Sequence, residues 1–209
     1  VEALVSADVL ALGFTKQGDE KIEITGSPRV VAAIEKFYEI NLIDEVAFFQ
    51  PTGKAGELFE IPVLHKDSTV DRLFLVAVGD GSLTSLRAAG AALGRKVRGK
   101  AIELVSLLAQ SRAEIRAHGV SILLGAYTWN LKTSGPAEIP TFTIATDEKD
   151  VLAQANVIAT SVVLARDLIH TPSNIKNPEW LAKQATAMVS AAKNSDLSIT
   201  VKSDRKSVV

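Results

Sequence analysis

Short apolar runs alternate with amphipathic stretches along most of this chain of 209 residues. The runs are rich in Val, Ile, Leu and Phe, and each is short enough to be a single strand. Because they are apolar almost without interruption, they are typical of strands that are covered on both faces. The expected strands are Val9 to Phe14, Leu58 to Leu64, Leu73 to Val78, Ile102 to Leu108, Phe142 to Ala145 and Leu197 to Val201.

Helical spacing and helix-capping residues occur between these runs. Ser27 before Pro28 is typical of an N-cap followed by a proline in the first turn, and Asn177 before Pro178 repeats that pattern. Ser111 to Glu114 has the sequence of a capping box. The expected helices are Pro28 to Ile40, Thr84 to Arg98, one that starts at Ser111, Lys149 to Ile169, and one that starts at Asn177.

The alternation of strands and helices predicts an α/β fold with a mixed, mostly parallel sheet flanked by helices. We expect residues 1–148 to form a first domain and residues 149–170 to form a linker helix. Residues 171–209 would then supply the first helix and strand of a second domain. The boundary itself is expected between Thr133 and Pro140 or in the long helix that follows.

Composition limits the classes of function. Lys and Arg number 23 and Asp and Glu number 24, so the net charge is -1 and provides no long-range attraction to nucleic acid or an anionic membrane. The chain has no cysteine, which excludes a thiol nucleophile, a disulfide and a cysteine-ligated zinc. We expect no apolar run to approach the length of a membrane-spanning helix. Neither end resembles a natural terminus, so we expect the chain to be a fragment.

Three segments resemble the leucyl (cytosol) aminopeptidase family. Leu73 to Gly79, followed by Leu83 to Gly94, is similar to the family's strand, glycine turn and Ala-rich helix. Gly119 to Trp129 resembles its helix that ends in Leu-Gly-Ser-Tyr and an aromatic residue, with Ala126 in place of Ser. Ala165 to Asn174, then Asn177-Pro178, resembles the junction Ala-Arg-Asp-Leu-x-Asn-Thr-Pro-x-Asn, with His170 in place of Asn.

The resemblance implies a macro-domain-like amino-terminal domain followed by the start of a catalytic domain. It implies a cytoplasmic parent enzyme that removes amino-terminal residues, preferably Leu, from peptides. It also implies two divalent metal ions, Mn or Zn, and assembly into a homohexamer. The family's metal-binding strings, Gly-Lys-Gly-x-x-Phe-Asp-Ser-Gly-Gly and Asn-Thr-Asp-Ala-Glu-Gly-Arg, do not occur in this sequence. We therefore assign no catalytic, cofactor or metal residue to this chain, and we expect it to be inactive alone.

The histidines offer little metal-binding chemistry. His65, His118 and His170 lie far apart in the sequence, and no H-E-x-x-H motif occurs. Asp167 and His170 could share one face of a helix, but two groups are too few to hold a metal. We interpret the histidines as structural or solvated residues, and Asp167 with His170 as a helix end and its cap.

Glycine and basic residues suggest phosphate contacts, each with a simpler explanation. Gly79-Asp80-Gly81 lies between a strand and a helix but lacks the third glycine and the lysine of phosphate-binding loops, so we interpret it as a tight turn. The basic residues on the next helix complement the helix dipole; they are Arg87, Arg95, Lys96, Arg98 and Lys100. Gly90 and Gly94 on the same helix are expected to admit another element at close range.

Two functions from different classes remain open. The first is the amino-terminal part of a metallo-aminopeptidase, with a structural role in assembly and access to the active site. The alternative is a non-catalytic, macro-like module that binds nucleotide or DNA. The sequence that follows Val209 would discriminate between them, because only an aminopeptidase would carry the two metal-binding segments there.

Overall fold

The computed structural model describes residues 6–18, 21–129, 137–192 and 196–202. Its contacts divide the chain into two compact units, Val1–Leu164 and Ala165–Val209. The division lies inside the interval that the sequence analysis assigns to a linker helix. The first unit contains a sheet with the strand order β3-β4-β1-β5-β6, and β2 pairs with β1 beside this path. The strands are β1 Val9–Gln17, β2 Lys21–Thr25, β3 Leu58–Pro62, β4 Arg72–Ala77, β5 Glu103–Ser106 and β6 Thr141–Ile144.

The expected fold class is confirmed, because the sheet is mixed and mostly parallel. β1 runs parallel to β4 and β5, and β5 runs parallel to β6. β2 and β3 are antiparallel to their neighbours. The helices are α2 Pro28–Tyr38, α3 Leu42–Phe48, α4 Leu83–Val97, α5 Arg112–Gly125, α6 Lys149–His170 and α7 Pro178–Ala191.

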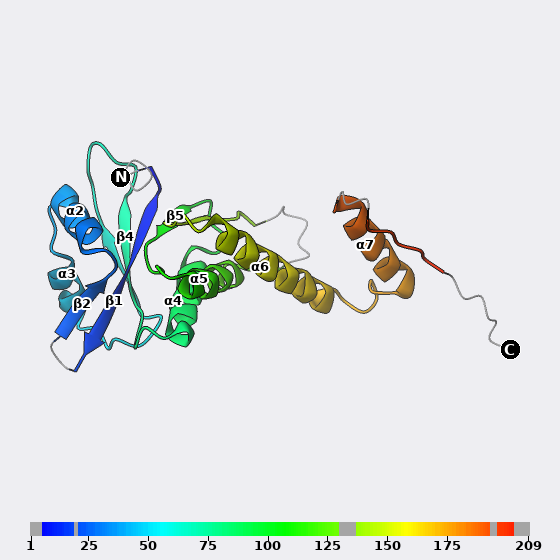
Figure 1. Cartoon of the computed structure of the whole chain (residues 1–209), viewed down its shortest axis with the longest axis horizontal. Helices are drawn as coiled ribbons and strands as arrows, with labels where there is room; N and C mark the ends of the chain where they lie inside the picture. Colours follow the sequence, from blue (N-terminus) through cyan, green and yellow to red (C-terminus); the bar gives the residue numbers. More distant parts are fainter. Residues whose placement is uncertain (1–5, 19–20, 130–136, 193–195, 203–209) are drawn as a thin grey trace. The chain divides into compact units, whose positions relative to one another are not determined.

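The central strands are covered on both faces. In β1, Leu10, Leu12 and Phe14 pack in a core with α2 and α3, whereas Val9 and Ala11 pack in a second core with α4 and α5. The residues of β4 alternate in the same way. Figure 1 shows α2 and α3 on one side of β1 and β4, and α4 and α5 on the other. Two buried faces require the continuous apolar runs from which the strands were predicted.

Three expectations about secondary structure were incomplete or wrong. β2 and α3 were not predicted: β2 is a short edge strand whose charged residues are exposed, and α3 has only seven residues. The strand expected from Leu197 to Val201 is wrong, since this segment has no strand structure. A strand needs a neighbour for its backbone hydrogen bonds, and no described residue pairs with this segment. The first part of the expected boundary segment, residues 133–136, lies outside the described residues.

The helix α6 is long and apolar enough to cross a membrane by length and composition alone, although only 11% of its most apolar window is buried. The expectation that no apolar run reaches this length is therefore wrong. The amino-terminal part of the helix packs inside the first unit, where Val151, Ala155 and Ala159 are buried. A core helix of a water-soluble protein satisfies the same criterion.

Glycines allow α4 and α5 to pack backbone against backbone, as the sequence analysis expects for Gly90 and Gly94. A Cβ on Gly94 would lie 2.2 Å from the carbonyl oxygen of Ile122, and one on Gly90 would lie 2.2 Å from Oγ of Ser121. On the facing helix, a Cβ on Gly125 would lie 2.6 Å from the carbonyl oxygen of Ala91. Because carbon and oxygen cannot approach this closely, side chains at these positions would force the helices apart.

We predict that Gly94→Ala lowers the free energy of unfolding by at least about 2 kcal/mol, because rigid backbone must move to admit the methyl group. Gly119→Ala on α5 is the matched control. Its Cβ would meet only side chains, Ala155 at 3.2 Å and Ile144 at 3.4 Å. We expect that control to change stability by less than about 1 kcal/mol, since alanine favours the helix. Urea unfolding of both variants tests this, and equal losses would contradict it.

We also predict that the two units differ in stability. No residue of α7 is buried, and Leu181 and Met188 are 55% and 49% exposed. A helix that buries so little apolar area cannot offset an ordering cost of about 1–2 kcal/mol per residue. In hydrogen exchange, the amides of α7 and residues 196–202 should exchange rapidly, while those of β4 and β5 exchange slowly. Equal protection in both units would refute this division.

Candidate functional site

His118 and Ser106 form a fully buried pair in the first unit. Nε2 of His118 lies 2.8 Å from Oγ of Ser106, and the backbone N–H of Leu108 donates to the same oxygen at 3.4 Å. Both side chains are 0% exposed. The pair resembles a nucleophile with its base, but no substrate can reach it. Its role is to satisfy polar groups between β5 and α5.

Burial lowers the pKa of His118 to about 4, because the charged ring would lose its hydration. The nearby backbone carbonyl of Leu86 opposes this shift. Nδ1 of His118 makes no hydrogen bond of ordinary geometry. The ring is therefore neutral at physiological pH.

The other two histidines lie apart from His118. The ring of His65 contacts the ring of Phe37, with centroids 3.9 Å apart, and its Nδ1 accepts the backbone N–H of Asp67 at 3.2 Å. His65 lies in the loop after β3 rather than at the strand end that its sequence position suggested. His170 is the last residue of α6 in the second unit. In the described parts of the chain, no three His, Asp or Glu residues are arranged to hold a metal ion.

The turn at Gly79-Asp80-Gly81 places a carboxylate at the amino terminus of α4. Asp80 accepts a hydrogen bond from the backbone N–H of Ser82 at 3.0 Å and another from Oγ of Ser85 at 2.7 Å. The bonds from Ser85 and Ser82 lower the pKa of Asp80 to about 2. Gly79 and Gly81 have φ angles of 57° and 73°, which glycine adopts without strain. The position where a phosphate would bind a helix terminus thus holds the chain's own anion.

The basic residues of α4 do not act as one group. Lys96 is paired with Glu60 at 2.7 Å and lies 5.8 Å from the centre of the Phe74 ring. Glu60 also pairs with Arg72, and the hydrogen bond from Lys96 lowers the pKa of Glu60. The remaining basic residues of the cluster are exposed; they are Arg87, Arg95, Arg98 and Lys100.

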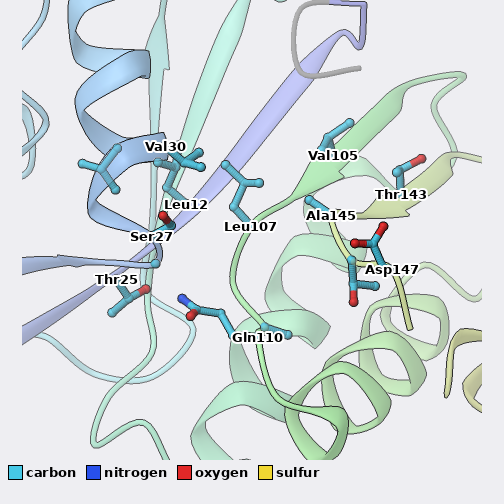
Figure 2. A pocket seen from close by; sticks show the side chains of 14 residues that line it. Leu12, Thr25, Ser27, Val30, Val105, Leu107, Gln110, Thr143, Ala145 and Asp147 are labelled. Carbon is cyan, nitrogen blue, oxygen red and sulfur yellow. The ribbon is translucent and has the colours of Figure 1, made fainter. Parts of the chain in front are cut away.

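A cavity of about 520 Å³ lies on the sheet face that carries α2. It forms where two strands share one edge of β1: β5 pairs with Val9 to Ala11, and β2 pairs with Gly13 to Gln17. Leu12, between these two pairings, lines the cavity. The remaining wall comes from the start of α2 and from the loops that follow β5 and β6 (Figure 2).

Local hydrogen bonds fix the wall of this cavity. The capping box of α5 forms as predicted, and Glu114 also accepts the backbone N–H of Gln110 at 3.0 Å. Gln110 is thereby held just before the amino terminus of α5. Ser27 is the N-cap residue of α2, but its side chain makes no capping hydrogen bond. The hydroxyl of Thr25 is buried without a hydrogen-bond partner in the described structure.

This cavity was not predicted from the sequence. Its polar residues are dispersed over the chain, and none belongs to a motif with characteristic spacing. One signal was available: polar residues follow directly after strand ends, as in Ala145-Thr146-Asp147 and Ala109-Gln110. The carboxyl ends of parallel strands meet at one edge of a sheet, and ligands of open α/β sheets bind there.

No family profile matches the chain. The probable cytosol aminopeptidase of Picosynechococcus sp. is 27% identical over 199 residues, which cover 88% of this chain and 39% of that protein. The proteins of the same name from Gloeothece citriformis and Mycobacterium marinum are 28% and 25% identical, with 88% of this chain covered in each case. The chain thus spans about two fifths of the length of the curated relatives it matches.

Solved structures agree on the fold. A mutant of tomato leucine aminopeptidase matches 89% of this chain with a TM-score of 0.66 at 18% identity, which covers 40% of that chain. The bottromycin maturation enzyme BotP matches 89% with a TM-score of 0.63 at 20% identity, which covers 38% of that chain. The first unit therefore shares its α/β fold with these solved structures. The resemblance to the leucyl (cytosol) aminopeptidases, inferred from three segments, is confirmed over most of the chain.

We predict that the neutral state of His118 makes the fold acid-sensitive. The pKa of His118 is about 4 in the folded chain, against an ordinary value of 6.5. The unfolded chain therefore binds the proton first as pH falls. This contribution to the free energy of unfolding is complete above pH 6.5 and is lost toward pH 4, by up to about 3 kcal/mol.

Urea unfolding of the wild type and His118→Gln across this pH range should show a flatter pH dependence in the variant. His65→Gln is the control, and a wild-type slope in His118→Gln would contradict the prediction.

Proposed function

We propose that this chain is the amino-terminal part of a cytoplasmic leucyl aminopeptidase that removes amino-terminal residues, with a preference for Leu, from peptides. The observation that carries the proposal is the similarity over 88% of the chain to proteins named probable cytosol aminopeptidase. The order and spacing of the three family-like segments between Leu73 and Pro178 support it independently.

The chemistry of the parent enzyme would depend on two divalent metal ions, Mn or Zn. One solved relative, BotP, is described in complex with Mn. A pair of such ions polarises the scissile carbonyl and makes hydroxide available at neutral pH. The two metal-binding strings of the family are absent from this sequence. We therefore assign the metal ligands to a segment corresponding to the part of the relatives that this chain does not match.

The role proposed for this chain is structural: it shapes a homohexameric assembly and restricts access to the active site. Apolar side chains of the second unit support the existence of a further partner surface. Leu181 and Met188 on α7 are exposed, as are Leu197, Ile199 and Val201 after it. The catalytic domain that follows in the parent would cover them and would supply the strand neighbour that residues 197–201 lack here.

The alternative, a module that binds nucleotide or DNA, has less support. Asp80 occupies the helix terminus that a phosphate would use, and Lys96 is neutralised by Glu60. In the part of the chain that the structure describes, the residues that line the cavity include Asp147 and no Lys or Arg. A lining of this charge disfavours phosphate.

We predict that residues 1–209 alone have no metal-dependent peptidase activity. Leucine p-nitroanilide would be incubated with the purified chain and added Mn²⁺ or Zn²⁺, with the Picosynechococcus sp. relative as the positive control. No turnover is expected because the metal-binding strings are missing. Metal-dependent turnover that co-elutes with the chain on gel filtration would refute the assignment of the chemistry to another segment.

Reading the gene past Val209 tests the proposed parent directly. Both metal-binding strings are expected within the following coding sequence. A stop codon soon after Val209 would eliminate the aminopeptidase proposal and leave the binding module.

A further inference from the structure

We propose that the cavity between β1, β5 and α2 binds a small organic cation, a primary ammonium group attached to an apolar body. The topology of the sheet supports this proposal. β1 leads through β2 to α2 on one face of the sheet, whereas β5 leads to α5 on the other face. The cavity lies at the carboxyl ends of β5 and β6, beside the middle of β1. Ligands of open α/β sheets bind at the carboxyl ends of strands where the connections diverge. The volume of about 520 Å³ is suited to a small molecule.

Three acidic residues lie where the loop after β6 enters α6: Asp147, Glu148 and Asp150. Arg112 forms ion pairs with both Glu148 and Asp150. No described residue forms an ion pair with Asp147, which lines the cavity. Among the described residues, the lining of the cavity therefore contains one carboxylate and no cationic side chain.

Neutral polar groups also line the cavity. Figure 2 shows Thr25, Ser27 and Gln110 along one side of the cavity and Asp147 on the opposite side. The hydroxyl of Ser27 is exposed and is not used to cap α2. This hydroxyl oxygen and the amide oxygen of Gln110 accept hydrogen bonds, which an ammonium group or other polar atoms of the ligand can donate.

The floor of the cavity is apolar. Leu12 and Val105 are 1% and 2% exposed and present the buried sheet surface to the cavity. Val30 and Val31 of α2 and Leu107 extend this surface. None of the described residues that line the cavity is aromatic, so they offer a nucleobase no stacking partner. A flexible aliphatic body fits this lining better than a flat ring.

Three compounds with the same branched carbon chain test the proposal: isoamylamine, isoamyl alcohol and isovalerate. Each is titrated into the isotopically labelled chain at neutral pH and followed in two-dimensional amide NMR spectra. The amine should shift the signals of residues 25–27, 109–110 and 145–147. It should bind at least about tenfold more tightly than the alcohol or the acid, because only the ammonium group both donates a hydrogen bond to Asp147 and carries the opposite charge.

Matched variants locate the interaction. Asp147→Asn should weaken binding of the amine by about tenfold or more. Asp150→Asn removes an equal charge three residues away, from a carboxylate that faces Arg112, and should leave binding within about twofold. Ala145→Leu adds bulk at an exposed position in the lining and should abolish binding. An amide spectrum with the wild-type dispersion confirms that each variant is folded.

The proposal is overturned if isovalerate binds as tightly as the amine, if Asp147→Asn binds the amine as the wild type does, or if the amine shifts signals only outside the cavity. It is also overturned if the amine does not bind at all. Peptidase activity plays no part in this test, so its failure would leave the proposed function unchanged.

Discussion

The contact between α4 and α5 is made by backbone atoms, and the arrangement of the first unit depends on it. Gly90 and Gly94 on α4 and Gly125 on α5 leave no room for side chains between the helices. The close packing of α4 and α5 brings α5 near enough to the sheet for His118 to reach Ser106 at the end of β5. It also directs the start of α5, and with it Gln110, toward the carboxyl ends of the strands. A wider separation of α4 and α5 would break the hydrogen bond between His118 and Ser106 and would move one wall of the cavity.

Much of this fold was predictable because the strongest local signals agree with the final packing. β1 and β4 are buried on both faces, so their sequences are apolar throughout, and α5 begins with a capping box that forms as expected. β2 was not predicted because its exposed residues, such as Lys21 and Glu23, have no apolar pattern. It exists through its pairing with β1, which is a tertiary interaction. The segment from Leu197 to Val201 shows the converse: its composition suits a strand, but composition does not provide a neighbouring strand.

The candidate site was less predictable than the fold, for a physical reason. Catalytic motifs are visible in sequence when several groups lie on one turn or helix, whereas this cavity collects single residues from several strand ends. Asp147 illustrates the problem. In the sequence it is one of three acidic residues in a short run, and only the ion pairs of Arg112 with Glu148 and Asp150 distinguish it. His118 is similar, because its burial and its bond to Ser106 depend on the glycines of another helix.

The cavity and the proposed aminopeptidase chemistry impose different electrostatic demands. A two-metal centre needs several carboxylates close together, which repel one another until the metals bind. In the described residues no three acidic side chains are arranged to hold a metal, and several acidic side chains already have partners: Glu60 pairs with Lys96 and Arg72, Asp80 with two serines, and Glu114 with the amides at the start of α5. Asp147 has no ion-pair partner among the described residues, but it is exposed, so water solvates its carboxylate when no cation is bound.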